Sequence, residues 1–164
     1  MLRSWLAAVV LMAGMIPLGF SHGRAQAPTP DVSPPPPFNP SFGDLMNTLV
    51  QPRHAKLGLI VREQNWTLAA YEIHQLKDAL ANIAKWRPRF GKSPVAEMMA
   101  STVASPISAL ENAVQTRDAE HLAAAYAQLT DGCNSCHAAL NHPYIVIQAP
   151  DQSSFANQNF RSPK

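Results

Sequence analysis

The chain has 164 residues, of which 46% are hydrophobic, and its 13 basic and 11 acidic residues give a formal net charge of +2. These charges form no basic stripe, so we expect no nucleic acid partner. The two cysteines are Cys133 and Cys136, which excludes a zinc site built from four thiolates. The sequence holds no nucleophile–base pair, phosphate loop or carboxylate pair, and we therefore do not expect an enzyme.

Residues 1–25 are predicted to be a signal peptide. Arg3 supplies a short positive region, and the stretch from Leu6 to Phe20 is apolar but interrupted by glycine and proline. This stretch is too short and too broken for a membrane span. The small residues Gly23 and Ala25 favour cleavage after Ala25. We expect a periplasmic protein that has no membrane segment after cleavage; an uncleaved N-terminal anchor is the alternative.

Residues 26–42 are rich in proline and include an unbroken run from Pro34 to Pro37. Proline fixes φ and lacks an amide proton, so such a stretch favours extended polyproline II structure over a helix. We expect a linker that leads into a folded domain. A proline-rich ligand for a partner domain is the alternative.

Four helices are predicted over residues 43–140. The first runs from about Gly43 to Gln64, and Pro52 either kinks it or opens its main piece. The second spans about Trp66–Trp86 after the N-cap Asn65, the third begins at Ser93-Pro94, and the fourth begins at Asp118. Apolar residues recur at helical spacing in each helix and the connections are short. These features predict an all-α fold, an antiparallel four-helix bundle.

Residues 141–164 are predicted to form an irregular C-terminal tail. Asn141-His142-Pro143 is typical of a turn. The β-branched stretch Tyr144–Ile147 is expected to be extended and to lie over the bundle, with Phe155 and Phe160 as anchors farther along the tail.

The fourth helix runs into Cys133-Asn134-Ser135-Cys136-His137, which is the attachment signature of a c-type haem. Residues three apart share one face of a helix, so both thiols can reach one edge of a porphyrin and add to its two vinyl groups. His137 follows at once and would be an axial ligand of the iron. An export signal agrees with this reading, because covalent haem attachment in bacteria takes place outside the cytoplasmic membrane.

Other uses of the two cysteines are a disulfide, half of a zinc site, or a thioredoxin-like redox pair. A redox pair opens a helix, where the helix N-terminus lowers a thiol pKa, but Cys133 and Cys136 come at the end of a helical run. A zinc site would need a distant histidine without the usual spacing. A disulfide does not explain His137.

A bundle with this motif near the end of its fourth helix resembles the cytochrome c′ and cytochrome c-556 group, over about Gly43 to Leu140. The resemblance implies one covalent haem c, with Cys133 and Cys136 as thioether sites and His137 as the proximal iron ligand. In that group a first-helix residue meets the other face of the haem. A methionine there gives an electron carrier, and a non-ligating apolar residue gives a five-coordinate, gas-binding centre. Homodimers are common in the group, so a homodimer is also implied.

This chain departs from the group in its first helix and in its longer tail. The first-helix stripe contains His54, which is either the distal iron ligand or a histidine bonded to a carbonyl or a haem propionate. Met46 lies two turns earlier and is the second candidate for the distal ligand. Arg53 could pair with a propionate through its guanidinium, or lie exposed.

We expect an exported cytochrome that passes electrons to redox partner proteins. The alternative is a five-coordinate haem protein that binds a small gas, NO or CO. A haem-free thiol–disulfide or scaffold protein is a third hypothesis, from another class.

Overall fold

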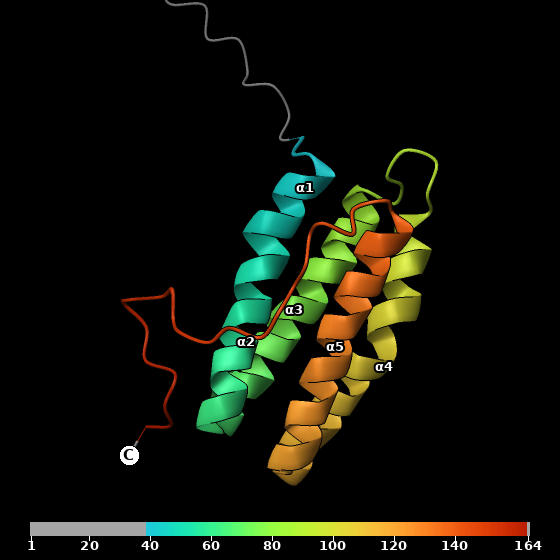
Figure 1. Ribbon diagram of the computed structural model, residues 1–164. Helices are drawn as coiled ribbons and strands as arrows, with labels where there is room; N and C mark the ends of the chain where they lie inside the picture. The colour runs from blue at the N-terminus through green and yellow to red at the C-terminus, as the bar shows by residue number, and fades with distance from the viewer. Residues whose placement is uncertain (1–38, 164) are drawn as a thin grey trace, which may run out of the picture. The chain divides into compact units, whose positions relative to one another are not determined.

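The computed structural model describes residues 39–163, so the predicted signal peptide and residues 26–38 of the linker lie outside the described part. All regular structure in this part is helical, in the order α1, η1, α2, α3, α4 and α5. The first three are continuous, which leaves four helical rods that lie side by side in Figure 1. The predicted all-α class with four helices is confirmed. No helix among residues 39–163 has the length and apolar character to cross a bilayer.

The first rod consists of α1 (Phe42–Leu45), the π-helical turn η1 (Met46–Val50) and α2 (Gln51–Glu63). It begins with a capping box, in which Ser41 and Asp44 bond each other's backbone amides. Pro52 lies in the first turn of α2. Because Pro52 has no amide to donate and its ring crowds the carbonyl four residues earlier, the preceding turn widens into a π-helix. The rod thus continues through Pro52 rather than dividing there.

The other helices have the predicted positions to within two residues. The predicted N-caps are confirmed: Asn65 caps α3 (Trp66–Trp86), and Asp118 caps α5 (Ala119–Ala139). The third helix, α4 (Val95–Thr116), begins later than predicted, with Pro94 at the N-cap and no side-chain cap. Ser93 is not a cap because its backbone amide and carbonyl both bond Phe90 in a tight turn.

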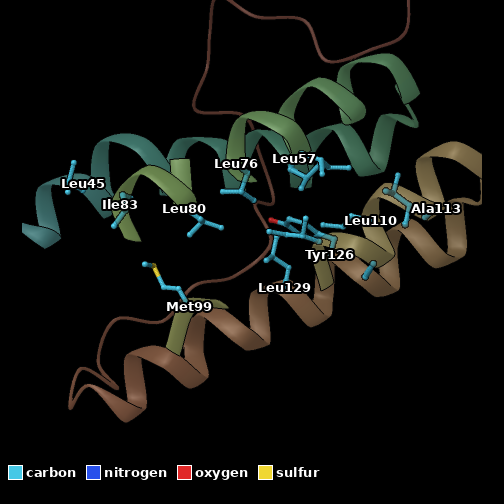
Figure 2. Close-up of a cluster of buried hydrophobic side chains, with 14 residues drawn as sticks. Leu45, Leu57, Leu76, Leu80, Ile83, Met99, Leu110, Ala113, Tyr126 and Leu129 are labelled. Atoms are coloured by element: carbon cyan, nitrogen blue, oxygen red, sulfur yellow. The ribbon is translucent and has the colours of Figure 1, made fainter. Parts of the chain in front are cut away.

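The core lies between the four rods. α2 packs against α3, α3 against α4, α4 against α5, and α5 against α2, so every rod contributes one apolar face. Figure 2 shows Leu57, Leu76, Leu110 and Tyr126 meeting in the centre, although they come from four different helices. A buried leucine stabilises the fold by about 1.5–3 kcal/mol relative to an exposed one. The helices therefore depend on each other, and the core fixes which faces turn inward.

Residues 141–163 of the tail form no helix or strand, as predicted, and they run back along the bundle (red in Figure 1). Gly58 on α2 makes room for it: a Cβ there would lie 2.6 Å from Cδ of Pro150. Farther along, the side chain of Phe160 is only 6% exposed and packs with Leu59, Ile60 and Ala69. Asn65 Nδ2 donates to the carbonyls of Phe160 and Arg161 at 3.1 and 3.0 Å. The described part of the tail is thus bound to the first two rods.

Candidate haem site

A cavity of about 570 Å³ opens at the end of the bundle that carries the cysteine motif. Its wall is built from α1, η1, α2, α3, α4, α5 and the tail, and apolar side chains predominate. They include Met46, Val50, Leu80, Met99, Val103 and Leu140. Cofactor and ligand pockets have volumes of about 300–1,000 Å³ and largely apolar walls. The cavity therefore has the size and chemistry of a site for a large, mostly apolar group.

Cys133, Cys136 and His137 all line this cavity. They project from the last turns of α5, where residues three and four apart share one face. The structure has both cysteines as free thiols. Burial raises the pKa of Cys133 to about 11 and also raises the pKa of Cys136. The thiols are thus neutral at pH 7, whereas a thioredoxin-like pair needs a lowered pKa.

The imidazole of His137 has a defined tautomer. Its Nδ1 lies 2.8 Å from the backbone carbonyl oxygen of Ile145 in the tail. A carbonyl oxygen only accepts a hydrogen bond, so Nδ1 carries a proton, and in the neutral form of the ring the lone pair is then on Nε2. A neutral imidazole with one free lone pair is the form that binds a metal ion.

His54 also lines the cavity, but both of its ring nitrogens have protein partners. The side chain is 3% exposed, and burial lowers the pKa of His54 to about 4. Nε2 lies 2.9 Å from the Thr130 hydroxyl, which itself donates to the Tyr126 carbonyl. The Tyr126 hydroxyl lies 3.2 Å from Nδ1 and 3.1 Å from the His54 carbonyl oxygen. The Thr130 hydroxyl, whose own proton goes to Tyr126, therefore accepts from Nε2–H, which leaves the lone pair of the neutral ring on Nδ1. That lone pair faces the Tyr126 hydroxyl, whose one proton is donated to Nδ1 or to the His54 carbonyl oxygen. Both ring nitrogens thus face protein groups in this conformation.

The other two predicted residues have different positions. Met46 lines the cavity from η1. Arg53 does not line it: its Nη1 donates to the Leu49 carbonyl at 2.7 Å, and its Nε is buried without a hydrogen-bond partner among the described residues. Burial raises the pKa of Glu72 on α3, and the nearby charges of Lys56 and Arg53 oppose that shift. The structure thus brings together Cys133, Cys136, His137, His54 and Met46, and leaves Arg53 outside the cavity wall.

Several residues of this wall were not predicted from the sequence. Met99 and Val103 of α4 and Leu80 of α3 also line the cavity. Phe90 lies at the rim, where its ring contacts Phe42 and His142, each with ring centroids 5.5 Å apart. Apolar residues at helical spacing, Met99 among them, indicate a buried helix face but do not indicate this cavity. Nothing in the sequence indicated Phe90, which follows a helix end.

Among residues 39–163, no group of three or more His, Cys, Asp or Glu side chains is placed to hold a metal ion. Comparison of the chain with family models, with curated proteins and with solved structures finds no match in any of the three. The geometry of the cavity therefore carries the functional argument.

Proposed function

We propose that this protein is an exported c-type cytochrome that holds one covalent haem and transfers electrons to redox partner proteins. One observation carries the proposal: Cys133, Cys136 and a His137 with a free Nε2 lone pair line the same apolar cavity of about 570 Å³. The donor set fits haem c, because two thiols three residues apart form thioethers and the next residue ligates the iron. A bound haem supplies the one-electron chemistry.

The protein provides the environment of the haem. The apolar side chains of η1, α3 and α4 keep water from the cavity, and a low local polarity tunes the potential of a haem iron. Both thiols are neutral and unpaired, so they remain available for thioether formation. The protein itself catalyses no substrate turnover in this proposal.

For the distal ligand, the register of the helices favours Met46 over His54. His54 bonds Thr130, which places these two residues level with each other. His137 follows Thr130 by seven residues on α5, a rise of about 10 Å. Met46 precedes His54 by eight residues on the first rod. In the antiparallel bundle that we infer from the short connections, both displacements lead to the same end. Met46 is then level with His137, and His54 lies about two turns deeper.

A five-coordinate, gas-binding centre is the second candidate function. The observation that favours it is the apolar part of the cavity wall, in which Val50, Leu80 and Val103 offer the iron no ligand. If the thioether of Met46 does not bind the iron, the distal side is open to NO or CO. The ferric spin state separates the two functions, since a methionine ligand gives low-spin iron and an open side gives high-spin iron.

The test of the proposal is a haem stain of the denatured protein. The full chain is produced in a host with a working haem-attachment system, beside the double variant Cys133→Ala, Cys136→Ala. The wild-type band should stain and the variant band should not, because only a thioether keeps haem on an unfolded chain. An unstained wild-type band, from protein that is soluble and exported, would overturn the proposal and leave the haem-free hypothesis.

A further inference from the structure

Asn134 occupies one of the two positions that the haem-attachment motif leaves free, and its side chain is half-buried. Its Nδ2 donates to the carbonyl of Ile147 at 2.9 Å, and its Oδ1 accepts from the amide of the same residue at 2.7 Å. One amide side chain thus satisfies both backbone groups of one tail residue. This pair of bonds holds the tail segment Tyr144–Ile147 against the last turns of α5.

The end of α5 directs the chain toward Asn134. Asn141 adopts a left-handed conformation with φ +62°, and its amide bonds the Ala138 carbonyl. The next amide, of His142, bonds the His137 carbonyl at 2.8 Å. These two bonds form a Schellman motif, in which a left-handed residue ends a helix and reverses the chain. The tail therefore returns over the cavity, and Tyr144–Ile147 forms part of its wall.

The returning segment also forms a hydrogen bond with His137. The Ile145 carbonyl accepts the Nδ1–H of His137 at 2.8 Å, two residues before the segment is held by Asn134 at Ile147. Such a bond fixes the ring orientation and tautomer of a metal-binding histidine and makes it a stronger donor. Ile145 and Val146 are 42% and 70% exposed, so burial alone does not hold this stretch in place.

We propose that Asn134 is a positioning residue for His137. It holds Ile147, and thereby keeps the Ile145 carbonyl where it orients the imidazole and leaves Nε2 directed to the cofactor. This inference rests on the proposed haem function, because the orientation matters only if His137 binds iron. The tail is then part of the proximal side of the site, and not only a cover for the bundle.

The test compares Asn134→Ala with a matched control, Ser135→Ala, in the ¹⁵N-labelled holoprotein. Ser135 is the other free position of the motif and its side chain is exposed. In the ferrous low-spin form, the wild type and Ser135→Ala should show a slowly exchanging His137 Nδ1 proton. In Asn134→Ala we expect the Nδ1 proton and the Ile147 amide to exchange about tenfold faster, the size of effect that lost hydrogen bonds produce. Asn134→Asp keeps the acceptor for the Ile147 amide and should restore most of the protection.

Rapid exchange of the Nδ1 proton in the wild type, or equal exchange in the wild type and Asn134→Ala, would overturn the inference. Failure of the haem proposal gives a different result, because the stained band is then missing from every variant. The Ile147 amide can be followed even in haem-free protein, where Asn134→Ala should still expose it. The two failures are thus told apart by the stain and the amide exchange together.

Discussion

His54 on α2 and Thr130 on α5 are joined by a hydrogen bond of 2.9 Å between Nε2 and Oγ1. With Tyr126, one turn before Thr130, they form a buried network in which each donor has an acceptor. Networks of this kind stabilise a unique arrangement only when every member is satisfied. The network therefore ties the first rod to the last, and it occupies the ring nitrogens that an iron ligand would need.

The distal ligand can be found by spectroscopy of methionine and histidine variants. Met46→Ala should convert low-spin ferric haem to high-spin, because it removes the thioether that the helix register places level with His137. Met99→Ala is the matched control, since Met99 also lines the cavity but comes from α4. It should leave the spin state unchanged. A low-spin spectrum in Met46→Ala together with a high-spin spectrum in His54→Ala would show that His54 binds the iron.

The pH dependence of stability reports on the environment of His54. Burial lowers the pKa of His54 from 6.5 to about 4, so the unfolded chain binds a proton more readily than the folded protein. The stability is fully present above pH 6.5 and falls as the pH is lowered toward 4. The loss is on the order of 3 kcal/mol, at about 1.4 kcal/mol per pKa unit.

The measurement is urea unfolding of the holoprotein between pH 8 and about 4, beside His54→Gln, whose amide does not titrate. Asp118 and His121 titrate in both proteins, so the difference between the two curves isolates His54. The wild type should lose more stability than the variant as the pH falls. Parallel curves would contradict the buried, neutral imidazole.

Gly58 should tolerate no side chain. A Cβ at this position would lie 2.5 Å from the Tyr126 hydroxyl and 2.6 Å from Cδ of Pro150. We expect Gly58→Ala to destabilise the protein by about 1–3 kcal/mol, the usual cost of overpacking, and to push the tail away from α2. Gly43→Ala on the same rod is the control, because its Cβ would meet only Ser41 Oγ, at 3.9 Å. Gly43→Ala should leave the free energy of unfolding unchanged or raise it by up to about 1 kcal/mol. Chemical unfolding of both variants measures these changes.

The tail should detach when its buried phenylalanine is truncated. Phe160 is 6% exposed against Leu59 and Ile60, and its removal should cost about 2 kcal/mol of tail binding. Limited proteolysis should then cut Phe160→Ala between residues 148 and 160 at a protease level that leaves the wild type intact. Phe155→Ala, which removes a less buried ring, should be cut more slowly. Equal resistance of the wild type and Phe160→Ala would show that the tail does not depend on this contact.

The local sequence determined the helices and one side of the site. The caps at Asn65 and Asp118 were predictable because capping depends on a side chain and an amide only three residues away. The grouping of Cys133, Cys136 and His137 on one face follows from the helical repeat alone. Pro52 was predicted to interrupt the helix, but the π-helical turn before it was not predicted. A kink and a widened turn both accommodate a proline ring and its missing amide proton, so the sequence does not distinguish them.

The tertiary structure decided which residues lie across the cavity from the cysteine motif and which partners they have. The apolar stripe of the first helix already placed His54 inward, but the sequence left open the position of Arg53, about 100° away around the helix axis. The packing puts the charge of Arg53 near Glu72 of α3, outside the cavity wall. The partners of His54 are on α5, more than 70 residues away, and the carbonyl that orients His137 belongs to a tail whose path depends on the left-handed Asn141. Spacing along the sequence specifies which side chains share one face of a helix, whereas packing between distant segments specifies which groups those side chains contact.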